Sequence, residues 1–192
     1  MAWNTLLALV PLLVSFAVFR SRAVRPWRSP WWWVGVAAFV ALLPNAPYVL
    51  TDVVHLQPQL AWAPSDGHRL LLAGEYGAFI AVGLGAYALS LWNLQAFLRR
   101  RGVGLPGVVA AMGILHALST LGVYLGRVHR WNSWDLIRTP GAILDDIGQG
   151  LGQEHTVARL VAVFLMLAVG ATAFVSAIQA GSTAVRARMH RG

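Results

Sequence analysis

Five long apolar stretches, separated by shorter polar segments rich in arginine, limit what this chain can fold into more than any other feature. A helix needs about 20 apolar residues to cross the hydrocarbon core of a bilayer. Hydrophobic residues make up 57% of the 192 residues and charged residues only 11%, whereas soluble domains carry about 25% charged residues. The sequence therefore predicts an all-α, multi-pass protein, a five-helix bundle in one transmembrane domain (residues 1–192), with spans at about Ala2–Phe19, Trp31–Leu50, Leu70–Leu98, Pro106–Leu125 and Val157–Ala180.

The charged residues of the loops alternate in kind along the chain. The first, third and C-terminal polar segments carry ten arginines and no acidic residue, whereas the second and fourth carry five arginines and all seven acids. Because arginine-rich loops stay in the cytoplasm, we expect the N-terminus outside and the C-terminus inside. All the acidic residues then lie toward the outer side: Asp52, Asp66, Glu75, Asp135, Asp145, Asp146 and Glu154.

Two features of the composition exclude classes of function. The chain has no cysteine, which excludes disulfides, cysteine-ligated cofactors and cysteine nucleophiles. All fifteen basic residues are arginines, and most of them flank the apolar stretches. This placement is typical of a membrane topology signal rather than of a nucleic-acid groove. We therefore expect membrane lipid, and no nucleic acid, as a partner.

A short helix is predicted outside the bilayer over about residues 139–151. Thr139 is expected to cap its beginning, and Pro140 suits its first turn. Its apolar residues form one face, as in helices that lie on a membrane surface: Ile143, Leu144, Ile147 and Leu151.

The second span ends in a polar motif over residues 43–55, which contains two prolines. Proline removes a backbone donor and breaks the helical ladder. If the helix resumes afterwards, the side chains of four polar residues share one face through spacings of three and four: Asn45, Tyr48, Asp52 and His55.

Two interpretations of this motif stay open. In the functional one, Asp52 and His55 bind a divalent metal or act as an acid–base pair, and Asn45 and Tyr48 contact a substrate. In the structural one, the prolines kink the helix, Asp52 caps its end, and His55 is a solvated surface residue.

A second polar motif follows the fourth span, over residues 126–135. Arg127 and Arg130 can clamp one phosphate group through their planar guanidinium groups, and Asn132 and Asp135 add further polar contacts. The alternative is that the arginines pair with acidic residues to hold helix ends together. Glu75, about one turn into the third span, needs an arginine or a metal, or it will hold a proton. Its natural partners are Arg127 and Arg69.

These two motifs resemble a family of bacterial integral-membrane proteins catalogued as domain of unknown function 1361. The resemblance implies a multi-span protein of the bacterial cell (inner) membrane and no particular activity. The matching residues are Leu43-Pro44-Asn45-Ala46-Pro47-Tyr48, Thr51-Asp52, His55-Leu56, Gly126-Arg127, Arg130 and Asn132-Ser133-Trp134-Asp135.

Three functions compete. The first is an outward-facing site that binds or acts on a lipid-linked, phosphorylated substrate, with Asp52, His55 and Glu75 as catalytic or metal-binding groups. The second is a non-catalytic binding or assembly subunit. The third is a transporter or channel component, which is disfavoured because the inner halves of the spans carry only scattered polar groups such as Ser15 and Asn93. The sequence leaves open whether the chain is an enzyme, which metal it uses, and its oligomeric state.

Overall fold

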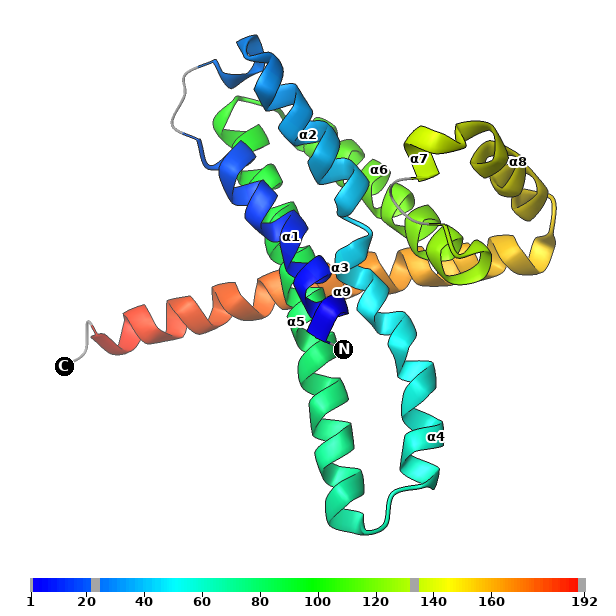
Figure 1. Cartoon of the computed structure of the whole chain (residues 1–192). Helices are drawn as coiled ribbons and strands as arrows, with labels where there is room; N and C mark the ends of the chain where they lie inside the picture. The colour runs from blue at the N-terminus through cyan, green and yellow to red at the C-terminus, as the bar shows by residue number, and fades with distance from the viewer. Residues whose placement is uncertain (1, 22–24, 132–134, 190–192) are drawn as a thin grey trace.

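The computed structural model describes residues 2–21, 25–131 and 135–189, and all regular structure in these ranges is helical (Figure 1). This confirms the predicted all-α class. Four helical segments in the described ranges are long and apolar enough to cross a membrane, and a shorter apolar helix precedes them. The long segments are Pro30–Ala61, Asp66–Arg100, Leu105–His129 and Glu154–Ala177, and the shorter one is Trp3–Phe19.

The helices lie close to where apolar length predicts them. Helix α1 covers Ala2–Phe19, the predicted range, and the third and fourth spans extend a few residues beyond it at most. The last helix continues well past the predicted end of the fifth span. Apolar length is a reliable guide because the thickness of the bilayer sets it. The three long helices are α5 (Asp66–Arg100), α6 (Leu105–Tyr124) and α9 (Glu154–Met189).

The second span is broken at the predicted place. Helix α2 (Pro30–Leu42) ends just before Pro44, and a single turn, α3 (Asn45–Tyr48), follows. The chain then tightens into a 3-10 helix, η2 (Val49–His55), before α4 (Leu56–Ala61) resumes. Pro47 has no backbone N–H, so the Leu43 carbonyl accepts from the Ala46 N–H instead, at 3.2 Å. The prolines therefore bend the helix without unravelling it.

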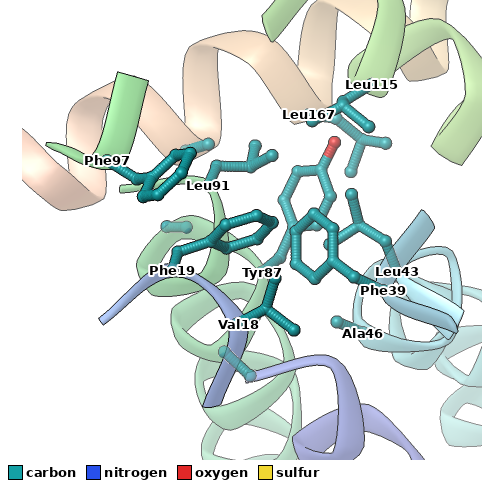
Figure 2. Close-up of a cluster of buried hydrophobic side chains, with 13 residues drawn as sticks. Val18, Phe19, Phe39, Leu43, Ala46, Tyr87, Leu91, Phe97, Leu115 and Leu167 are labelled. Carbon is teal, nitrogen blue, oxygen red and sulfur yellow. The ribbon is translucent and has the colours of Figure 1, made fainter. Parts of the chain in front are cut away.

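The core lies where α1, α2, α5, α6 and α9 meet. Figure 2 shows the Tyr87 ring beside those of Phe19 and Phe39, with its hydroxyl oxygen directed toward Leu115 and Leu167. Phe19 and Phe39 meet edge to face, with ring centroids 4.9 Å apart. Such aromatic pairs contribute about 0.5–1.5 kcal/mol beyond the area they bury. This cluster fixes how the helices are arranged around α5.

Helix α9 departs from the predicted bundle. Helices α1, α2, α5 and α6 run in broadly similar directions, whereas α9 crosses α5 steeply (Figure 1). The crossing is short: Leu167 and Ala171 are buried there, and the Phe174 ring packs against Gly85 of α5. The structure contains the five predicted apolar helices, and α9 packs on α5 over only a few turns. The orientation of the chain across the membrane stays a prediction based on the arginines.

The packed part of α5 has the thickness of a bilayer. Its buried residues run from Tyr76 to Phe97, which corresponds to about 33 Å at 1.5 Å per residue and matches a hydrocarbon core of about 30 Å. The preceding part of α5, residues 66–75, forms with α4 a hairpin that extends beyond the bundle (Figure 1). Glu75 therefore lies at the edge of the packed region.

Glycines let the broken span approach its neighbours closely. A Cβ on Gly83 of α5 would clash with Val49 and lie 2.7 Å from the Ala46 carbonyl oxygen. A Cβ on Gly122 of α6 would lie 2.5 Å from Pro44. The segment 44–49 is therefore wedged between α5 and α6.

Candidate functional site

Helix α6 ends in an unusual turn that reorients the residues after it. Residues Leu125–His129 form a π-helical turn, η3, and Arg130 follows in the left-handed conformation, with φ 58° and ψ 29°. The Trp131 N–H then closes the helix end by donating to the Leu125 carbonyl at 3.2 Å. Both π turns and non-glycine residues in the left-handed region concentrate at functional sites.

The π turn brings two side chains together that an α-helix would separate. Tyr124 and His129 are five residues apart, which is the spacing that a π turn closes. Their ring centroids lie 5.4 Å apart, and the Tyr124 hydroxyl lies 3.4 Å from His129 Nε2. In a regular α-helix the partners would be three or four residues apart. The turn therefore builds the site.

Asp146 of the following helix, α8 (Pro140–Leu151), completes this cluster. Its Oδ2 atom lies 2.9 Å from His129 Nδ1 and accepts a 2.7 Å hydrogen bond from the Trp131 indole N–H. The His129 and Asp146 side chains are 27% and 25% exposed, respectively. We name Tyr124, His129, Trp131 and Asp146 the His129 cluster. It is half-buried and open to the surface.

Helix α8 begins and ends where the sequence predicts, and it packs over this cluster. Its Ile143 is buried, and a Cβ on Gly150 would lie 2.8 Å from the Tyr124 hydroxyl. The predicted cap was wrong, because the Thr139 hydroxyl turns back toward the Asp135 carbonyl, at 3.4 Å, and caps nothing. Pro140 occupies the first turn as expected.

The two polar motifs meet in space. The Tyr48 ring packs against Gly126, where a Cβ would lie 3.1 Å from Tyr48 Cε2. Asp52 faces elsewhere: its Oδ2 accepts a 2.8 Å hydrogen bond from Asn4 of α1. The predicted common face of Tyr48 and Asp52 was therefore wrong. The reason is the 3-10 helix, whose three residues per turn align i with i+3 and rotate i+4 away.

The predicted acid–base residues differ in their contacts and exposure. Asp52 is half-buried against α1, whereas His55 and Glu75 are exposed. Arg69, a partner considered for Glu75, instead pairs with Asp66 at 3.3 Å. Among the described residues, no three histidine or acidic side chains are close enough to hold a metal ion. The assignment of a metal to Asp52 and His55 stays a prediction that rests on two ligands.

The predicted phosphate-binding arginines flank the His129 cluster. Arg127 and Arg130 lie on and just after η3, and both are exposed. Neither makes a hydrogen bond or ion pair with another described side chain. Asn45 and Asp135 are half-buried, and Asn132 lies outside the described residues. The pairing of these arginines with Asp52 or Glu75 is thus not found in the described part of the chain.

Two further polar networks lie in the core. The Tyr87 hydroxyl is 2.7 Å from Nδ1 of the buried His116. A separate chain of hydrogen bonds joins α1 to α5: Arg20 donates to Asn93 at 2.9 Å, and Asn93 donates to Ser15 at 2.8 Å. The sequence suggested that Ser15 and Asn93 were scattered polar groups, but in the structure they are hydrogen-bonded to each other.

The long apolar helices and the polar cluster at the end of one of them define the class: this is a multi-pass membrane protein. More specifically, the chain belongs to the DUF1361 family, described as "Protein of unknown function", which it matches over residues 3–170. That range contains both polar motifs and the whole His129 cluster. No curated protein and no solved structure matches the chain.

Proposed function

We propose that this protein binds the phosphorylated headgroup of a lipid or lipid-linked substrate at the outer face of a bacterial inner membrane. The observation that carries the proposal is the pair Arg127 and Arg130, both exposed and without a partner among the described residues. Arginine in such a position can form two parallel hydrogen bonds to a phosphate. Since no described side chain pairs with either guanidinium group, this absence supports the binding of an anion by both.

The position of these arginines supports a lipid headgroup as the ligand. They follow directly on an apolar helix of 20 residues, α6, which is about the length needed to span the hydrocarbon core. This length supports a position of their guanidinium groups at the level of the headgroup phosphates. The exposed Val128 between them offers apolar surface to the adjoining acyl region.

The strained backbone supports a functional role for this turn. A non-glycine residue in the left-handed region is less stable by about 1–2 kcal/mol, and Arg130 is such a residue among those described. The π turn and the contacts of Trp131 hold it there. Such strain is typical of ligand-binding positions.

Binding of dodecyl phosphate to the purified protein in detergent micelles tests the proposal. We expect Arg127→Ala and Arg130→Ala each to weaken binding about tenfold or more. The reason is that a hydrogen bond to a charged group contributes about 1.5–3 kcal/mol, and about 1.4 kcal/mol corresponds to tenfold in affinity. Isothermal titration calorimetry measures the affinity, and dodecanol and inorganic phosphate separate lipid recognition from binding of a free anion.

The matched control is Arg99→Ala, which removes an exposed arginine at the far end of the α5–α6 pair. It should bind dodecyl phosphate as the unaltered chain does. An Arg127→Ala, Arg130→Ala double variant that is folded and binds with unchanged affinity would refute the proposal. If Arg99→Ala weakened binding of dodecyl phosphate equally, the effect of Arg127 and Arg130 would be one of overall charge and not of a specific site.

A further inference from the structure

We propose that the His129 cluster is a catalytic centre in which His129 is the acid–base group for hydrolysis of a phosphate ester. This inference rests on the proposed headgroup binding and adds chemistry to it. The sequence had placed the acid–base groups at Asp52, His55 and Glu75, of which Asp52 accepts a hydrogen bond from Asn4 and the other two are exposed. The structure assembles a different set, with Asp146 orienting the imidazole.

The geometry leaves one imidazole nitrogen able to take up a proton. A neutral imidazole that donates from Nδ1 to Asp146, 2.9 Å away, carries its lone pair on Nε2. The Tyr124 hydroxyl lies 3.4 Å from Nε2, which is too long for a strong hydrogen bond. Water or a substrate oxygen can replace this weak contact.

The carboxylate is itself held in place. The Trp131 indole N–H donates to the same Asp146 oxygen at 2.7 Å, so the carboxylate cannot rotate freely away from His129. A base oriented by a second group is the recurring arrangement of acid–base and nucleophilic sites. A surface ion pair that only joined two helices would not need this third contact.

The cluster and the arginines lie on the same short segment. His129 stands between Arg127 and Arg130 in the chain, within and just after the π turn. Because Arg127 and Arg130 are two residues and one residue from His129 in the chain, their long side chains can bring a bound phosphate to the imidazole. The arginines would also stabilise the charge that builds up on the phosphate oxygens during reaction.

The step balances with water as the co-reactant. His129 Nε2 takes a proton from a water molecule, and the water oxygen forms a bond to phosphorus. The bond between phosphorus and the ester oxygen breaks, and its electron pair stays on that oxygen. The departing oxygen then takes the proton from Nε2. The products are inorganic phosphate and the free alcohol, or the monophosphate ester where the substrate is a diphosphate, and His129 is regenerated.

Phosphate release from three probes in detergent micelles tests the inference: dodecyl phosphate, phosphatidic acid and farnesyl diphosphate. We expect the unaltered chain to release phosphate from at least one of them and His129→Gln to lower kcat about 100-fold, the usual contribution of acid–base catalysis. Asp146 is a positioning residue. Asp146→Asn should lower kcat about tenfold or more with KM unchanged, and Asp146→Glu should recover part of the loss.

The controls lie beside the cluster. Asp145→Asn removes the neighbouring exposed carboxylate of α8, and His155→Gln removes an exposed histidine at the start of α9. Both should leave kcat unchanged. If His129→Gln does not fold, the comparison of Asp146→Asn with Asp145→Asn decides the question.

Three negative results are distinguishable. A chain that binds dodecyl phosphate through Arg127 and Arg130 but releases no phosphate from any probe would overturn the catalytic inference and leave the binding function standing. Phosphate release that His129→Gln and Asp146→Asn do not slow would overturn the role of His129. Loss of arginine-dependent binding would instead refute the proposed function.

Discussion

Replacing Gly83 with alanine is expected to leave little folded protein. A Cβ at this position would overlap the Val49 side chain and lie 2.7 Å from the Ala46 carbonyl oxygen. The carbonyl belongs to the backbone of the wedged segment 44–49 and cannot rotate away as a side chain could. Overpacking of this kind lowers stability by about 1–3 kcal/mol or more, and we expect the upper end here. Thermal unfolding in detergent, followed by tryptophan fluorescence, measures the effect.

Gly77→Ala on the same helix is the matched control. No atom lies within 4 Å of a Cβ built on Gly77, so this substitution should not lower the melting temperature. A Gly83→Ala protein that melts like the Gly77→Ala protein would show that the segment 44–49 is not wedged against α5.

Tyr87→Ala is expected to have the second large effect. Tyr87 is fully buried at the centre of the core (Figure 2), and truncating a buried aromatic residue to alanine costs about 3–5 kcal/mol. Tyr87→Phe separates the ring from its hydroxyl. It keeps the packing but leaves Nδ1 of the buried His116 without its partner, which should cost about 1–3 kcal/mol.

The hydrogen bond can be isolated in a double-mutant cycle. Tyr87→Phe combined with His116→Leu removes both polar partners and should be less destabilised than the sum of the single variants. Tyr76→Phe is the control, because Tyr76 is buried on the same helix without a hydrogen bond to another described residue. Additive effects of Tyr87→Phe and His116→Leu would contradict the proposed partnership.

The fold was largely predictable because bilayer thickness and proline act locally. Apolar length located α1 and α6 to within one residue and α5 to within four, and Pro44 with Pro47 marked the break in the second span. The steep crossing of α9 was not predictable. It depends on where Phe174 meets Gly85, which is a contact between residues far apart in the chain.

The candidate site was only half predictable, for a physical reason that differs between residues. Arg127 and Arg130 were found because arginines at the end of an apolar helix are conspicuous. Asp146 was missed because its contact with His129 depends on the π turn and on α8 folding back over it. Neither the π turn nor the folding back of α8 can be recognised from residue spacing in the sequence. The one indication in the sequence that Asp146 could belong to a site was its position on a helix whose opposite face is apolar.

The glycine contacts explain why the two polar motifs belong to one structural unit. Pro44 and Tyr48 of the first motif pack on Gly122 and Gly126, which lead into the second. A displacement of one motif therefore displaces the other. This is why both need to be altered together in any attempt to rebuild the site.

The left-handed conformation of Arg130 has a practical consequence for engineering. Glycine adopts this backbone conformation without the steric penalty that arginine incurs, so a selection for heat resistance alone would favour glycine at position 130. The resulting protein would withstand higher temperatures and lack one of its two guanidinium groups. Thermal robustness would thus be a misleading guide to improved variants at this residue.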